Sequence, residues 1–271
     1  MSSPPAPPPI VLIHGLWLTP LSWEGWKTRF EGRGHQVLAP PWPRLHGDVE
    51  DVRRDPTPLE GLGVAEIVDH YATIVRGLER PPVIIGHSFG GLVTELLLDR
   101  GMGAAGVAIS PAPIKGVLRL PLAVLRSALP VLGNPMNRRR TVELTRKQFN
   151  YAFTNTMSPD EARAAYDRYQ IPGPGRPIFQ AAFANIAPNP PTKVDFHNDD
   201  RAPLLVIGND QDHTVPASLS REAAKRLGRS KAVVDYHEFA GRPHFTVGAP
   251  GWESIADYAL DWATRHTGAP G

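Results

Sequence analysis

Six runs of apolar, mostly β-branched residues constrain the fold of this 271-residue chain more than any other feature. They occupy residues 9–14, 36–39, 82–86, 106–110, 203–208 and 232–239. Their hydrophobicity is continuous rather than alternating, as strands buried on both faces of a parallel sheet require. Between them, segments such as 63–78 place apolar residues at the i, i+3, i+4 spacing of a helix with one buried face. The alternation of strand and helix predicts an α/β fold with a doubly wound parallel sheet.

The segment at residues 112–200 interrupts this alternation. It contains helical patterns and many prolines, but no run typical of a core strand. A segment of this length is too long to be a simple connection between two strands. We therefore expect a helical cap, inserted into a core formed by residues 9–111 and 201–271 and lying over one end of the sheet. Residues 1–8 are proline-rich and are expected to form a disordered lead-in.

The composition excludes several classes of site and partner. The chain has no cysteine, which rules out disulfides, thiol catalysis and cysteine-bound metal. No clustered metal ligands and no nucleotide-binding lysine motif occur in the sequence, so no metal and no nucleotide cofactor are expected. Lys+Arg 29 and Asp+Glu 27 give a net charge of +2, with both signs scattered along the chain, so a nucleic-acid partner is not expected. No pattern indicates the oligomeric state.

The longest mostly apolar stretch, residues 116–133, bears on whether the protein has a membrane partner. It contains two arginines and two prolines and is too interrupted to span a bilayer. We interpret residues 117–132 as a packed helix of the cap rather than as a membrane-facing lid. Residues 1–9 lack the basic and apolar regions of a secretory signal. No membrane partner is therefore expected, and a cytoplasmic location is the default.

Ser88 lies at the junction between an apolar run and a helical pattern, within PPVIIGHSFGGLVTELLLDRG at residues 81–101. Residues 86–90, GHSFG, match the pattern G-x-S-x-G. A sharp strand-to-helix turn at this pattern holds the serine hydroxyl out at the end of the sheet, and its glycines remove the Cβ atoms that would block the turn. The alternative interpretation is that Ser88 simply caps the helix. The strand pattern before it and the helical pattern after it favour a nucleophile.

These features, together with VLIHGLW at residues 11–17, resemble the α/β-hydrolase superfamily. The resemblance extends over residues 9–267, apart from the divergent segment at 112–200. It implies an α/β-hydrolase fold with a doubly wound, mostly parallel sheet. The family sheet has eight strands, but this chain begins almost directly with the strand that precedes His-Gly, so the resemblance implies a compact sheet of about six strands.

The resemblance also implies an oxyanion hole next to Ser88. In the family, a His-Gly pair follows a strand and the next residue donates a backbone N–H to the reacting oxygen. In this sequence that donor is Leu16, and its partner is the N–H of Phe89, directly after the nucleophile. Trp17 and His87 adjoin these two positions and are candidate substrate-binding residues.

The resemblance further implies the order serine, acid, histidine for a catalytic triad with Ser88. The loop after residues 203–208 contains Asp210 and Asp212. Family loops tend to place the acid four residues before the proline of a Val-Pro pair, which favours Asp212. Asp210 is the alternative, because it lies closer to the end of the strand. His244 lies between the last strand and the last helix, where the base is expected.

Such a triad implies a cofactor-free serine hydrolase that cleaves a carboxylic ester, lactone or thioester through an acyl-enzyme. Residues 101–106 have G-x-G-x-x-G spacing, but they follow a helix and precede a strand, the reverse of a dinucleotide site. Two alternatives stay open. One is a lyase, carbon–carbon bond hydrolase or perhydrolase with the same triad. The other is a non-catalytic member of the fold that only binds a ligand.

The cap indicates the kind of substrate. A cap that encloses the site excludes water and limits size, so we expect a small to medium hydrophobic ester-like substrate and no activation at an oil–water interface. Aromatic residues are frequent in the cap, and most of them are interpreted as its own core. They are Phe149, Tyr151, Phe153, Tyr166, Tyr169, Phe179 and Phe183.

Overall fold

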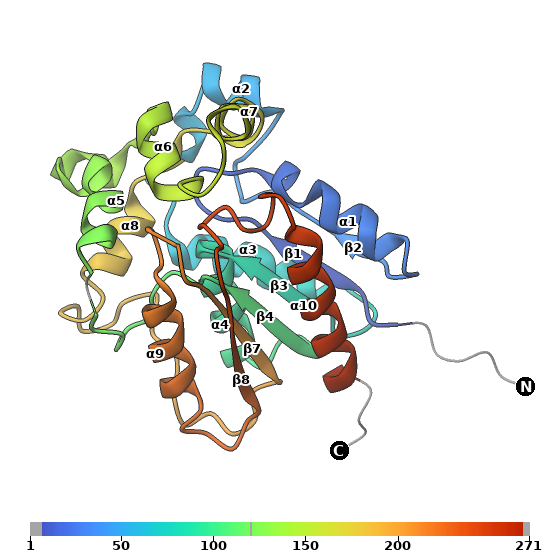
Figure 1. The fold of residues 1–271 in the computed structure, drawn as a ribbon. Coiled ribbons are helices and arrows are strands. Elements are labelled where there is room, and N and C mark those ends of the chain that lie inside the picture. Colours follow the sequence, from blue (N-terminus) through green and yellow to red (C-terminus); the bar gives the residue numbers. More distant parts are fainter. Residues whose placement is uncertain (1–6, 120, 268–271) are drawn as a thin grey trace, which may run out of the picture.

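The computed structural model describes residues 7–119 and 121–267, and a six-stranded sheet lies at its centre (Figure 1). The strand order is β2-β1-β3-β4-β7-β8, and every neighbouring pair is parallel. The strands are β1 (Ile10–Ile13), β2 (Val37–Leu38), β3 (Val83–His87), β4 (Ala105–Ile109), β7 (Leu204–Asn209) and β8 (Val234–Phe239). The four central strands are fully buried, because helices cover both of their faces. The predicted α/β-hydrolase sheet of about six parallel strands is confirmed.

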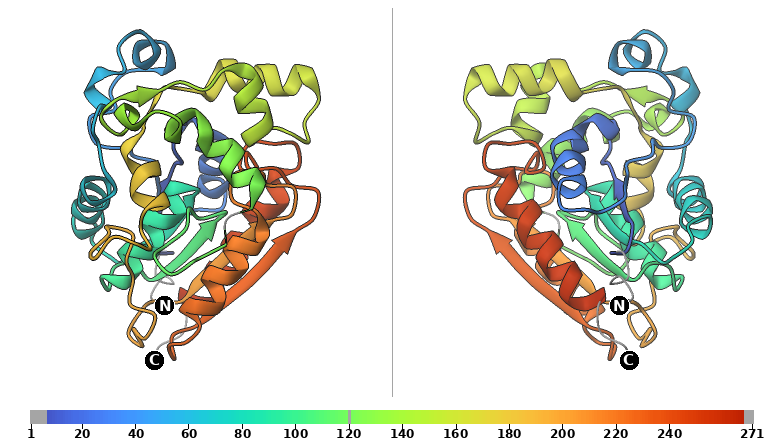
Figure 2. Two further views of the ribbon diagram at one scale, coloured as in Figure 1. Left: turned by 90° about the vertical axis from the view of Figure 1, so that its left-hand side faces the viewer. Right: turned by 90° about the vertical axis from the view of Figure 1, so that its right-hand side faces the viewer.

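Helices pack on both faces of the sheet (Figure 2). One face is covered by α1 (Glu24–Glu31) and α10 (Trp252–Thr267), and the other by α3 (Val64–Arg76), α4 (Phe89–Asp99) and α9 (Ala217–Leu227). Helix α4 is apolar along most of its length, and all of its residues from Phe89 to Leu98 are buried. It is therefore the central helix of the core, and its N-terminus is held rigidly at the end of β3. A short helix α2 (Val49–Arg54) lies outside these layers.

The segment expected to form the cap lies beyond the carboxyl ends of the strands (Figure 1). It contains α5 (Leu122–Leu132), α6 (Arg146–Phe153), α7 (Pro159–Tyr169) and α8 (Arg176–Ala182). Capping boxes begin α6 at Thr145 and α7 at Ser158. A small antiparallel ribbon of β5 (Thr141–Val142) and β6 (Gly173–Pro174) lies outside the core sheet.

Two expectations from the sequence concern the N-terminal segment and the apolar stretch at residues 116–133. The proline-rich lead-in falls mainly on residues 1–6, which lie outside the described residues. Within the described ranges, none of the helices has both the length and the apolar character needed to cross a bilayer. The interpretation of residues 117–132 as a packed helix is correct only for the inner side of α5, where Ser127 and Val131 are buried. Its outer side is exposed, with Leu122 at 84% and Leu129 at 63%.

Candidate active site

The turn between β3 and α4 is formed by backbone groups that approach too closely for any residue except glycine. A Cβ added to Gly86 would lie 2.0 Å from the carbonyl oxygen of Gly90, and a Cβ on Gly90 would lie 2.0 Å from that of Ile13. Ser88 sits between them with φ 56° and ψ −119°, a conformation that L-residues rarely adopt. The G-x-S-x-G pattern therefore forms the sharp elbow that the sequence predicts.

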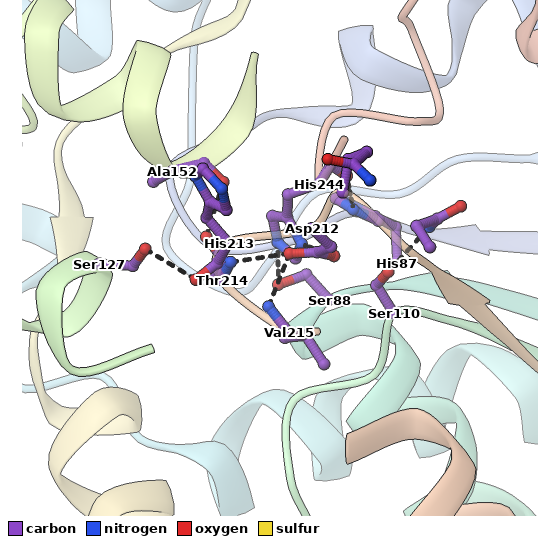
Figure 3. A network of polar contacts seen from close by, with 12 residues as sticks. His87, Ser88, Ser110, Ser127, Ala152, Asp212, His213, Thr214, Val215 and His244 are labelled. Carbon is purple, nitrogen blue, oxygen red and sulfur yellow. Dashed lines mark hydrogen bonds and ion pairs between the residues drawn. The ribbon is translucent and has the colours of Figure 1, made fainter. Parts of the chain in front are cut away.

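Ser88, His244 and Asp212 form a continuous chain of hydrogen-bonding groups (Figure 3). Ser88 Oγ lies 3.0 Å from His244 Nε2, and His244 Nδ1 lies 2.6 Å from Asp212 Oδ2. With the imidazole neutral and protonated on Nδ1, the serine hydroxyl donates to Nε2 and Nδ1–H donates to the carboxylate. All three side chains are buried. This is the arrangement of a Ser-His-Asp triad.

The structure distinguishes the two candidate acids. The other oxygen of Asp212, Oδ1, accepts hydrogen bonds of 2.7 Å from each of the backbone N–H groups of Thr214 and Val215. These bonds fix the direction of the carboxylate, and they leave Oδ2 to accept the hydrogen bond from His244 Nδ1. Asp210 instead accepts from the backbone N–H of Arg242 at 3.3 Å on the exposed side of the loop. The structure thus brings Asp212 to His244, and not Asp210.

The loop that carries the acid is tied to the cap by the two residues directly after Asp212 (Figure 3). Ser127 of α5 donates from Oγ to the carbonyl oxygen of His213 at 3.0 Å. Thr214 donates from Oγ1 to the carbonyl oxygen of Ala152 in α6 at 2.8 Å. Sequence reasoning did not find these bonds, because the partners are far apart in the chain and no local motif links them.

The substrate contact expected of His87 stays a prediction: its side chain lies beside His244 and is not among the residues that line the cavity next to Ser88. Its side chain is fully buried, its Nε2 lies 2.8 Å from the carbonyl oxygen of His244, and the two rings are 4.8 Å apart. Burial, and next the nearby His244, hold the pKa of His87 well below its usual value, so its ring is neutral. A neutral ring protonated on Nε2 donates to that carbonyl and so fixes the backbone of the base.

The cap also contacts the ring of His244. Phe153 of α6 meets it edge to face, with ring centroids 4.8 Å apart, and the N–H of Phe245 donates to the carbonyl oxygen of Phe153 at 2.8 Å. The base is therefore positioned by a core histidine and a cap phenylalanine together. No sequence pattern pairs these two residues, and only the folded structure reveals the contact.

The loop after β1 passes directly over the elbow. A Cβ on Gly15 would lie 3.0 Å from the Cβ of Ser88, so the backbone that leads to Leu16 is in contact with the nucleophile. His14 anchors this loop: its Nε2 accepts from the N–H of Trp42 at 3.2 Å, and the two rings stack. Burial lowers the pKa of His14 to about 4, which keeps Nε2 free to accept.

The two predicted oxyanion donors, Leu16 and Phe89, each follow a residue close to or identical with Ser88. Leu16 is buried in that loop, and Phe89 is the first residue of α4, so its N–H is one of those that no intrahelical partner can satisfy. Trp17 has a φ of 64° and is fastened to the cap, because its Nε1 donates to the carbonyl oxygen of Val142 at 2.9 Å.

A cavity of about 200 Å³ opens beside Ser88. From the core it is lined by residues that include Trp17, Phe89 and Val215, and from the cap by apolar side chains of α5 and α8 such as Ala128 and Ile178. None of the seven cap aromatics named from the sequence is among its lining residues in the described chain. Phe149 and Phe153 are instead buried against each other in the cap, with rings stacked 4.7 Å apart.

Comparison with known proteins agrees with this geometry. Residues 10–253 match the profile described as the Alpha/beta hydrolase family. The chain belongs to the alpha/beta hydrolase family. No curated protein sequence matches it significantly.

Solved structures with the same fold are similar to this alpha/beta hydrolase over nearly their whole length. An extracellular alpha/beta-hydrolase from a Paenibacillus species is 18% identical with a TM-score of 0.67, covering 95% of this chain and 99% of that one. The monoacylglycerol lipase of Paleococcus ferrophilus is 21% identical with a TM-score of 0.63, covering 95% and 94%. A pyrethroid hydrolase from Sphingobium faniae JZ-2 is 16% identical with a TM-score of 0.63, covering 94% and 97%.

Proposed function

We propose that this alpha/beta hydrolase cleaves carboxylic esters of small to medium hydrophobic compounds through an acyl-enzyme on Ser88. The observation that carries the proposal is the unbroken chain of hydrogen-bonding groups from Asp212 through His244 to Ser88. Its Ser88 end meets a mostly apolar cavity. A serine hydroxyl is a weak nucleophile unless a base accepts its proton and an acid orients that base, and all three groups are present in the required order.

The reaction follows from the positions of these groups. Ser88 Oγ attacks the acyl carbon while its proton passes to His244 Nε2, and Asp212 stabilises the resulting imidazolium. The backbone N–H groups of Leu16 and Phe89 stabilise the negative oxygen of the tetrahedral intermediate. His244 then returns the proton to the departing alcohol, and a water molecule activated by the same histidine hydrolyses the acyl-enzyme.

The cavity supports a hydrophobic acyl or alcohol group of limited size. Its walls are mostly aliphatic, and a volume of about 200 Å³ has room for a short chain or a single ring rather than a triglyceride. Proteins with a similar fold carry the names monoacylglycerol lipase, pyrethroid hydrolase and polyneuridine aldehyde esterase, which agrees with ester chemistry.

The test is hydrolysis of a series of aryl esters with increasing acyl length. We expect turnover by the parent protein and a fall of about 10⁶-fold in kcat for Ser88→Ala, with residual catalysis from the oxyanion hole alone. The fold should persist, because the glycines and not the hydroxyl form the elbow. Ser110→Ala is the control. Ser110 follows the neighbouring strand β4, and its buried hydroxyl accepts a hydrogen bond from the side chain of Asn209. This variant should retain turnover. Near-parental rates for Ser88→Ala would refute the proposal.

A further inference from the structure

Helix α5 presents an apolar face to solvent, and nothing in the described chain covers it. Leu122, Leu125 and Leu129 follow the i, i+3, i+7 spacing of one helix face, and all three are exposed. Leu118, just before the helix, is 67% exposed. The other side of α5 packs against the cap, and Val124 and Ala128 line the cavity beside Ser88. Leu125 contributes both to the exposed face and to the cavity wall. Arg126 is the one charged residue of the helix, and the other exposed side chains are leucines. An apolar helix face is normally buried, so the outer face of α5 lacks a partner within the described residues.

Exposed apolar side chains are concentrated in this part of the molecule. Of the large hydrophobic residues that are most exposed in the described chain, all but Val233 lie between residues 118 and 186. Besides the leucines they are Met136, Phe183 and Ile186. Met136 and Phe183 border a hollow that also holds Arg138, Arg139 and Arg176. The apolar face of α5 therefore has cationic side chains on one flank.

A cationic groove of about 620 Å³ lies on its other flank, along α9. Arg221 and Lys225 lie four residues apart on α9, and Arg229 follows just after the helix ends at Leu227, so the three form an exposed cationic stripe. Within the described residues, Lys225 and Arg229 take part in no ion pair, whereas Arg221 is paired with Glu238. The protein's net charge is only +2, so this stripe is a local concentration of positive charge.

The groove and the apolar face are continuous. Leu118 and Arg119 line both the groove and the cavity beside Ser88. The N–H of Leu118 contacts the carboxylate of Glu222 in α9 at 3.5 Å, and Arg119 lies 3.6 Å from the same side chain. Helices α5 and α9 both lie on the side of the molecule that faces the viewer in Figure 2 (left), with α5 above α9. A partner that covers this side can therefore contact both.

We infer that α5 and the cationic stripe of α9 form one surface that docks on an anionic lipid surface. The leucines enter the boundary between headgroups and acyl chains, while Lys225 and Arg229 contact the anionic headgroups. The cavity mouth at Leu118 then faces the lipid. This differs from the sequence-based expectation of no membrane partner, which assumed that the whole of residues 117–132 is packed.

The charges favour a lipid surface over a second copy of the chain. In a symmetric dimer through α5, each copy would bring its own cationic stripe against the same surface of the other. Like charges would then face each other across the contact, which disfavours that association. An anionic surface instead complements the stripe and covers the leucines at the same time.

The experiment measures binding to phosphatidylcholine vesicles prepared with and without phosphatidylglycerol. Leu122→Gln/Leu129→Gln tests the apolar face, and neither residue lines the cavity beside Ser88. Lys225→Glu/Arg229→Glu tests the stripe. Arg76→Glu/Arg265→Glu is the control, with the same change of charge at exposed positions on α3 and α10. Hydrolysis of a water-soluble aryl ester by each variant, and sedimentation without vesicles, complete the comparison.

We expect the parent protein to bind the anionic vesicles, more weakly at high salt, and to bind neutral vesicles poorly. The leucine variant should lose about tenfold in binding for each side chain, and the stripe variant about fivefold for each cation. The control should bind like the parent, and all variants should hydrolyse the water-soluble ester at the parental rate. Hydrolysis of the water-soluble ester thus tests the proposed esterase activity independently of vesicle binding.

Three results would overturn the inference. The first is no binding to anionic vesicles. The second is binding that both double variants retain in full. The third is a dimer in solution that Leu122→Gln/Leu129→Gln dissociates, without any vesicle binding, which would make a second copy the partner of this face.

Discussion

The nucleophile elbow and helix α5 lie on opposite sides of the same cavity, and they are built in different ways. The elbow is held by backbone against backbone, with gaps that no Cβ can enter at Gly86 or Gly90. Helix α5 is held by side chains on one side, and its other side is open to solvent. In the proposed reaction, the catalytic groups therefore depend on rigid backbone geometry, whereas the fit of the substrate depends on side chains of the cap.

Apart from the loss of Ser88 itself, the largest effect is expected from the acid on the core side of the cavity. Asp212→Asn should lower kcat by about 10⁴-fold, because an amide cannot fix the tautomer of His244 or stabilise its imidazolium. Asp210→Asn is the matched control, two residues away on the same loop but without contact to His244, and it should cost little. Steady-state kinetics on one aryl ester decide the matter. The reverse ranking of the two variants would transfer the role of acid to Asp210.

A second prediction concerns how the stability of the protein depends on pH through Glu95 in helix α4. Burial raises the pKa of Glu95 in α4 from 4.5 to about 8, although the charge of Arg201 acts against this, and neither carboxyl oxygen has a hydrogen-bond partner among the described residues. The folded state therefore keeps this proton to a higher pH than the unfolded chain does. The contribution of Glu95 to stability is largest below pH 4.5 and is lost as the pH rises towards 8.

Glu95→Gln removes this titration while it preserves the shape of the side chain. Denaturant titration measures the free energy of unfolding of both proteins. Between pH 4.5 and 8, that of the parent should fall relative to that of the variant by on the order of 1 kcal/mol per pH unit. Parallel profiles for parent and Glu95→Gln would show that the carboxyl is ionised in the core.

The smallest effect is expected on the cap side of the cavity. Ala128→Leu adds volume to the wall that α5 contributes, so kcat/KM for longer acyl esters should fall about tenfold relative to that for the acetate. Leu122→Ala changes the outer face of the same helix and should leave this ratio unchanged. If Ala128→Leu lowered kcat/KM equally for every acyl length, α5 would influence the catalytic step rather than the fit of the acyl group, which contradicts the contrast between the elbow and the cap.

The same contrast explains what the sequence could predict. The elbow and the strands follow from local patterns, because glycines and continuous apolar runs have few structural alternatives. The prediction of His244 as the base came instead from the resemblance to the α/β-hydrolase superfamily. The direction of the Asp212 carboxylate depends on backbone N–H groups of Thr214 and Val215, which no side-chain pattern records. The position of His87 behind the base also depends on tertiary packing, as does the exposed face of α5.

The central claim, that Ser88 is a nucleophile activated by His244, is tested most directly by covalent labelling with an alkyl fluorophosphonate. Ser88 Oγ would attack phosphorus, expel fluoride and transfer its proton to His244, and intact-mass and peptide mass spectrometry would locate the adduct. We predict one adduct per chain, on Ser88, formed by the parent, absent in Ser88→Ala and formed orders of magnitude more slowly in His244→Ala. An unlabelled parent protein, or an adduct that Ser88→Ala forms at the parental rate, would contradict the account.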